Sequence, residues 1–258
     1  MSDTKPTPPN GIAILVPSSG RNVCIEWAMA LASLSFPVGM NHFWYISKAA
    51  PGSGHTRDKQ REELAEVAIK VNAEFMMWID DDTVPPASAV QELYYVLAQH
   101  PKAAICGGIY CTKDVPPMPI VFMELGAGPY WEWTIGDVFK CKGLGTGCMM
   151  VRTSVMKDIP KPWFKDTSEA KLGDTEMRNG IEVKIVGRSG TDDVFFAKKV
   201  SDAGYEIWAH GGVLPVHVDY ATGNTYKLPK NSYPVVTYQE KLDEVNANLP
   251  EGQKKILL

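Results

Sequence analysis

The order of apolar and polar positions predicts alternating strands and helices up to about residue 110. Apolar runs that stop at turn residues or at charges are typical of buried strands, and apolar side chains at intervals of three and four residues are typical of helices. The expected strands are residues 11–16, 41–47, 74–79 and 103–108, and the expected helices are residues 23–34, 56–72 and 87–99. Strands that alternate with helices form a mainly parallel sheet with helices on both faces, so we expect an α/β fold.

Two of these helices carry further signals. In the helix over residues 56–72, the apolar side chains are expected to share one buried face; they are Leu64, Val67, Ala68 and Val71. The helix over residues 87–99 is expected to open at Pro85 and Pro86, because proline suits the first turn of a helix.

The second half of the chain has a different pattern. Residues 110–147 are rich in proline, glycine and tryptophan, which indicates loops and a small antiparallel part. Residues 148–151 form another apolar run. A helix is expected at residues 192–203, ended by Gly204, with a strand at residues 205–208.

Composition narrows the class of protein. The chain has 258 residues, 45% hydrophobic and 22% charged, as a globular domain does. Its net charge of -4 argues against a general affinity for nucleic acid, although a local basic groove stays compatible with it. No apolar stretch approaches the roughly 20 residues of a membrane span, and residues 1–10 lack a signal-peptide core, so a cytoplasmic location is expected. The five cysteines lack paired spacing and are expected to be buried thiols.

Three consecutive carboxylates, Asp80, Asp81 and Asp82, follow the apolar run at residues 74–79. Like charges at the edge of a low-dielectric core raise one another's pKa, and a divalent cation such as Mg²⁺ or Mn²⁺ would neutralise them. In an extended segment Asp80 and Asp82 point one way and Asp81 the other. The alternative is a solvated acidic turn in which Asp82 caps the next helix.

In this segment an apolar strand is followed by Asp-x-Asp, then by Pro-Pro and a helix. This order resembles the Asp-x-Asp motif of GT-A fold glycosyltransferases, especially family 2-like enzymes, including small forms encoded by bacteriophages. The resemblance extends over residues 12–219. It implies a Rossmann-like GT-A fold and a manganese or magnesium ion that bridges the diphosphate of a nucleotide-sugar donor. Asp80 and Asp82 would hold that ion, and Asp80 and Asp81 would also contact the donor.

Other segments resemble the family in the same order along the chain. The loop after the first strand resembles the one that meets the nucleotide, Arg57 with Arg61 resembles the arginine-bearing helix, and a Gly-x-Gly segment resembles the strand that lines the donor sugar and the acceptor. The residues expected to bind the donor are, besides the aspartates, Pro17, Ser18, Arg21, Arg57, Gly145, Thr146 and Gly147.

The catalytic base is expected at residues 190–193, which resemble the Gly-Glu-Asp segment of inverting members. Both Asp192 and Asp193 open a helix, where one of them can serve only as an N-cap. The alignment favours Asp193 as the base, with Asp192 second. His217 resembles the late histidine that completes the metal site, and His210 and Asp219 are the alternative ligands.

The resemblance divides the chain into a leader (residues 1–10), a single domain (residues 11–220) and a C-terminal extension (residues 221–258). Within the domain, residues 11–110 would bind the nucleotide and residues 111–220 would carry the acceptor and the catalytic groups. The donor would be a UDP- or GDP-sugar, and the pattern favours inversion at the anomeric carbon. The acceptor hydroxyl could belong to a glycan, a lipid-linked sugar, a protein or a modified DNA base.

Two other functions fit part of the same pattern. Residues 80–84 also resemble the Asp-x-Asp-x-Thr/Val motif of haloacid-dehalogenase-like phosphatases, with Asp80 as nucleophile and Asp82 as acid or base. In that family the nucleophile strand usually opens the fold, whereas about 70 residues with predicted structure precede it here. The third possibility is a protein that binds a nucleotide sugar without turnover.

Overall fold

A computed structural model describes residues 11–20, 22–48, 56–166, 175–178, 181–184 and 191–228. Their centre is a seven-stranded sheet in the order β2-β1-β3-β9-β5-β12-β7. The strands are β1 (Ile12–Ser18), β2 (His42–Lys48), β3 (Phe75–Ile79), β5 (Ala103–Gly108), β7 (Val138–Cys141), β9 (Cys148–Arg152) and β12 (Glu206–His210). Every strand and helix expected from the periodicity within the described residues is present, with ends displaced by one or two residues.

Most strands of this sheet are parallel. Strands β2 and β3 flank β1 and run parallel to it, and β12 runs parallel to β5. Strand β9 is antiparallel to both of its neighbours, β3 and β5, and β7 is antiparallel to β12. The mixed α/β fold with a mainly parallel sheet is therefore confirmed. The antiparallel strand β9 lies at the middle of the sheet, which accounts for its unbroken apolar sequence.

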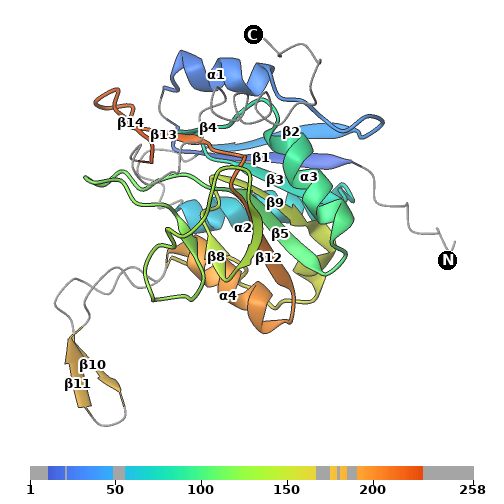
Figure 1. Cartoon of the computed structure of the whole chain (residues 1–258). Coiled ribbons are helices and arrows are strands. Elements are labelled where there is room, and N and C mark those ends of the chain that lie inside the picture. Colours follow the sequence, from blue (N-terminus) through green and yellow to red (C-terminus); the bar gives the residue numbers. More distant parts are fainter. Residues whose placement is uncertain are drawn as a thin grey trace, which may run out of the picture.

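Helices cover both faces of the sheet (Figure 1). Alternate residues of β1 belong to different cores: Ala13 packs with the helices of one face and Ile12 with those of the other. Residues of α2 (Arg57–Lys70) and α4 (Asp192–Asp202) belong to the first core. Residues of α3 (Ala89–Gln99) belong to the second, against which Leu31 of α1 (Ile25–Ala32) packs.

The buried face of α2 differs from the expected one. Leu64 and Ala68 are buried, but Val67 is only partly buried, and Val71 is 40% exposed because the helix ends at Lys70. The face continues instead towards the N-terminus of α2, where Gln60 and Arg61 are 3% and 1% exposed. This end of the helix lies beside the carboxyl ends of β1 and β3, so its buried side chains are polar.

Three smaller sheets complete the fold. Strand β13 (Val216–Val218) lies between β14 (Thr225–Tyr226) and β4 (Thr83–Val84). The other two are the pairs β6 (Val121–Phe122) with β8 (Gly143–Leu144) and β10 (Thr175–Arg178) with β11 (Ile181–Lys184). A 3₁₀ helix, Thr153–Lys157, follows β9.

The pairing of β13 with β4 sets His217 opposite Thr83, next to the acidic cluster. The leader and most of the C-terminal extension lie outside the described residues. Within the described part, no helix is long and apolar enough to span a bilayer.

Candidate functional site

The three aspartates form a turn at the carboxyl ends of the parallel strands, where ligands bind in open α/β sheets. Backbone contacts hold the turn in place. The Asp80 amide donates to the carbonyl of Gly147 at 3.1 Å, and the Asp80 carbonyl accepts bonds from Thr83 N at 3.1 Å and from the indole of Trp27 at 2.9 Å. The position of the turn is thus determined by the residue before β9, by β4 and by α1 together.

Two adjoining cavities open at this turn. The β1 cavity, of about 410 Å³, is bordered by Pro17, Ser19, Asp81 and Tyr220 among others. The α4 cavity, of about 310 Å³, is bordered by Thr146, Asp192, Asp193 and His217 among others. Both are bordered by Arg57, Asp80, Asp82 and Lys113. Taken together, the two cavities are bordered by most of the residues expected to form the site.

Asp81 differs from its two neighbours in direction. Its Oδ2 accepts hydrogen bonds from Ser18 Oγ at 3.0 Å, Ser19 N at 2.7 Å and Ser19 Oγ at 2.9 Å. It borders the β1 cavity only, whereas Asp80 and Asp82 border both cavities. Residues 80–82 form a turn and not the expected extended segment, yet Asp81 still differs from Asp80 and Asp82 in its contacts, and it joins the turn to the loop after β1.

Arg61 joins the acidic turn to the start of α4. Its Nη2 donates to both carboxylate oxygens of Asp80, at 2.9 and 3.0 Å, and its Nε donates to Asp192 Oδ2 at 2.7 Å. Burial disfavours the charge of this side chain, but Asp80 and Asp192 outweigh that effect and raise the pKa of Arg61. Burial raises the pKa of Asp80 even though Arg61 and Arg57 act to lower it.

Asp82 has two other partners. Lys113 Nζ donates to its Oδ2 at 2.7 Å, and His217 Nε2 lies 3.4 Å from its Oδ1. Burial alone would raise the pKa of Asp82, but the interactions with His217 and Lys113 outweigh it and lower that pKa.

The tautomer of His217 follows from its second contact. Its Nδ1 lies 2.8 Å from the carbonyl oxygen of Cys111, and a carbonyl can only accept, so Nδ1 carries the proton. In the neutral ring the lone pair is then on Nε2, facing Asp82. Two lone pairs at this distance repel each other, and either a proton or a cation between them removes the repulsion.

The two aspartates at the start of α4 have different surroundings. Asp192 is 6% exposed and is held by Arg61. Asp193 accepts hydrogen bonds from the Thr191 hydroxyl and from Val194 N, the latter at 3.0 Å. Burial and the charge of Asp192 raise the pKa of Asp193. Among the described residues, no cation forms an ion pair with Asp193, so its carboxylate is the less neutralised of the two.

The Gly-x-Gly segment makes room for Tyr110. The amide of Gly147 donates to Tyr110 Oη at 2.9 Å, and a Cβ on Gly145 would lie 2.3 Å from that oxygen. The Tyr110 ring meets His217 edge to face, with centroids 5.3 Å apart. Thr146, which is 2% exposed, borders the α4 cavity. In this structure the two glycines therefore support His217 through Tyr110.

The structure places two of the three remaining expected residues. Arg21 is outside the described residues. His210, an alternative ligand, lies 3.7 Å from Glu92, whereas Asp219 borders the β1 cavity.

Sequence reasoning also missed parts of the site. It grouped Arg61 with Arg57 without expecting it to bridge two aspartates, although Arg61 continues the apolar spacing of Leu64 and Ala68. It did not single out Lys113, since a lysine in a proline-bearing loop carries no signal of its own.

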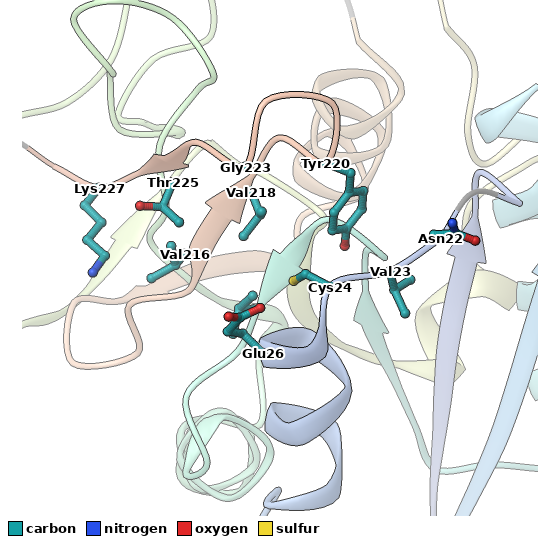
Figure 2. A pocket seen from close by; sticks show the side chains of 11 residues that line it. Asn22, Val23, Cys24, Glu26, Val216, Val218, Tyr220, Gly223, Thr225 and Lys227 are labelled. Carbon is teal, nitrogen blue, oxygen red and sulfur yellow. The ribbon is translucent and has the colours of Figure 1, made fainter.

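A third cavity, of about 520 Å³, is larger than the β1 and α4 cavities, and we name it the α1 cavity (Figure 2). It lies between the start of α1 and strand β13, and its walls include Val23, Val84 and Val218. Tyr220 separates it from the β1 cavity, since it borders both, and its hydroxyl is directed towards Cys24 in Figure 2. The acidic turn and Asp193 do not border the α1 cavity. We therefore take the β1 and α4 cavities as the candidate site.

A metal ion could be held by a smaller set of residues than expected. Among the described residues, no group of three or more His, Cys, Asp or Glu side chains is arranged to hold one. Asp82 and His217 supply an oxygen and a nitrogen at one point, and magnesium commonly takes only one or two protein carboxylates and completes its coordination with substrate phosphates and water. These two residues fit an ion that binds together with a diphosphate. Asp80 is less available, because Arg61 contacts both of its oxygens.

Comparison with protein-family models and with curated proteins finds no match. Among solved structures, the chain is similar to the protein titled A197 from STIV, with 14% sequence identity and a TM-score of 0.55. The similarity covers 85% of this chain and 95% of that one. At this identity the similarity shows the fold alone, and it extends over most of the chain.

Proposed function

We propose that this protein is a metal-dependent glycosyltransferase of the GT-A type, which transfers a sugar from a nucleoside-diphosphate sugar to a hydroxyl group. One observation carries the proposal. Asp82 Oδ1 and His217 Nε2 face each other at 3.4 Å on the border of the α4 cavity, which Asp193 also borders. A cation site and a carboxylate base at one cavity are what sugar transfer from a diphosphate requires.

Asp82 and His217 would hold the metal ion, with Asp80 as a third ligand through its remaining lone pairs. The ion would supply Lewis-acid stabilisation of the negative charge on the departing diphosphate. Arg57 borders both cavities, and its guanidinium can grip phosphate oxygens in a bidentate manner. The pKa of Arg57 is raised, mainly by the charge of Asp80, so the Arg57 guanidinium keeps its positive charge. A diphosphate on the common border of the cavities would contact both the metal ion and Arg57.

Asp193 would accept the proton of the acceptor hydroxyl. Its raised pKa makes it a stronger base than an ordinary aspartate, and the α4 cavity gives it access to a substrate. Asp192 is unsuited to that role because Arg61 already donates to it. This difference supports Asp193 over Asp192 as the base. The donor would occupy the β1 cavity, where Pro17 and Ser19 line the wall.

The test is a panel of nucleotide sugars and nucleoside diphosphates, each with and without Mn²⁺. We expect a matching diphosphate to raise Tm only when Mn²⁺ is present, because a ligand that binds only the folded state stabilises it. His217→Gln and Asp82→Asn should abolish this effect. Asp202→Asn is the matched control, because Asp202 is an exposed carboxylate paired with Lys198 on α4.

Two outcomes would count against the proposal. Stabilisation that persists in Asp82→Asn and His217→Gln would remove these residues from the metal site. Donor binding without hydrolysis or transfer to any acceptor would favour the binding protein. The phosphatase requires Asp80 as a nucleophile, and the two bonds from Arg61 to its oxygens argue against that role.

A further inference from the structure

Lys113 occupies a position next to Asp82 that a divalent ion would also need. Its Nζ lies 2.7 Å from Asp82 Oδ2, on the common border of the β1 and α4 cavities. His217 faces the other oxygen of the same carboxylate. A cation that binds to Asp82 therefore meets a positive charge already in place.

Lys113 and Arg61 differ in how readily they can leave their aspartates. The Arg61 side chain is 1% exposed and donates to two carboxylates, so its departure would leave two buried charges unpaired. The Lys113 side chain is 34% exposed and ends in a compact ammonium on a flexible stem. These differences favour exchange of the counter-ion at Asp82 over exchange at Asp80.

Hydrogen bonds hold the backbone next to Lys113. The amide of Thr112 donates to the carbonyl of Met118 at 2.8 Å, and Met118 N donates to Thr112 Oγ1 at 3.1 Å. Cys111, just before, forms a bridge with Pro119. The ammonium therefore remains within reach of both cavities after it leaves Asp82.

We propose that Lys113 is an exchangeable counter-ion of Asp82, which leaves the carboxylate when a divalent cation binds and then pairs with the diphosphate that this cation brings. The second step rests on the proposed function. Repulsion between the ammonium and a divalent ion at a few ångströms drives the exchange, and the negative diphosphate gives the ammonium a new partner.

The experiment compares Lys113→Met and Lys113→Arg with the wild type. Mn²⁺ affinity is measured first for the metal alone, by calorimetry or from the spectrum of free Mn²⁺. The affinity for uridine and guanosine diphosphates is then measured at saturating Mn²⁺. Lys140→Met is the control, because Lys140 is an exposed lysine paired with Glu206 away from both cavities.

In Lys113→Met we expect Mn²⁺ alone to bind about tenfold more tightly, because the competing charge is removed. We expect the diphosphate to bind about tenfold more weakly, because a phosphate partner is lost. Lys113→Arg keeps the charge, so both of its affinities should remain close to those of the wild type. The affinities of Lys140→Met should equal those of the wild type.

The possible failures are distinguishable. Equal Mn²⁺ affinity in the wild type and Lys113→Met overturns the exchange and leaves the proposed function standing. Tighter Mn²⁺ binding with unchanged diphosphate affinity overturns the second step. If no variant binds Mn²⁺, the exchange and the metal-dependent function both fall. If Lys113→Met binds Mn²⁺ more tightly but no donor is used, the exchange stands and the transferase does not.

Discussion

The acidic turn at residues 80–82 and the start of α4 at residues 192–193 both consist of aspartates, yet the aspartates within each region have different partners. Asp80 and Asp192 both accept hydrogen bonds from Arg61. Asp82 pairs with Lys113 and faces His217, and Asp193 accepts from a hydroxyl and an amide. In each region one carboxylate is held by a buried arginine and another faces the α4 cavity with partners that can change.

This difference leads to the hypothesis that the contacts of Arg61 divide the aspartates between two roles. A carboxylate bonded to a buried guanidinium is fixed in place with its oxygens occupied, which makes it a poor candidate for a base or a nucleophile. The carboxylates that Arg61 does not contact retain the capacity to bind a cation or a proton. The following predictions test this division, in order of decreasing expected effect.

The largest effect is expected for Asp193→Asn. If Asp193 is the base, kcat should fall by about 10²–10⁴-fold, because an amide cannot accept the proton. Steady-state kinetics with the donor found in the ligand panel would measure this. The free energy of unfolding at neutral pH should stay the same or rise, because burial of the Asp193 charge opposes folding and raises its pKa.

Asp192→Asn is the matched comparison for that prediction. It should alter the free energy of unfolding, since Arg61 then loses a charged partner, and it should lower kcat much less than Asp193→Asn does. A larger loss of kcat in Asp192→Asn would reverse the assignment of the base.

Arg61→Met should destabilise the protein by about 3–5 kcal/mol, since it removes the guanidinium that bonds to both the partly buried Asp80 and the buried Asp192. Denaturant unfolding would measure the difference. Arg57→Met makes the same chemical change one turn earlier on α2, at an exposed residue, and should cost at most about 0.5 kcal/mol. Similar losses in the two variants would contradict the special role of Arg61.

Asp81→Ala should cost about 1–3 kcal/mol of stability, because the amide of Ser19 loses its charged acceptor. Mn²⁺ affinity should change little, since Asp81 borders only the β1 cavity and is directed away from His217. A loss of Mn²⁺ affinity as large as that in Asp82→Asn would show that all three aspartates act as one metal site.

The smallest effect is a change of pH dependence in Thr191→Val. The Thr191 hydroxyl donates to Asp193 and lowers the pKa of that carboxyl against the stronger effect of burial, so its loss should raise the pKa further. A base must be deprotonated to act, so the acidic limb of kcat/KM should move to higher pH. An unmoved limb, or one that moves to lower pH, would exclude Asp193 as the group that titrates there.

The periodicity of the sequence was sufficient to predict the strands, the helices and the mainly parallel sheet, because burial of alternate or helically spaced residues leaves a local pattern. It also located the acidic turn and the start of α4, since charges that directly follow a buried strand or open a helix are visible in the sequence. Val71 shows the limit of this reasoning: its spacing fits the apolar face of α2, but the helix ends one residue before it.

Only the tertiary structure decided which aspartate has which partner. Arg61 lies far from Asp192 in the sequence, and Lys113 comes from a loop without periodicity, so no local pattern pairs them with their carboxylates. Strand β9 between β3 and β5, and β13 beside β4, bring Gly147 and His217 to the acidic turn. Interactions between charges depend on distance in space and on burial, and folding sets both across long separations in the chain.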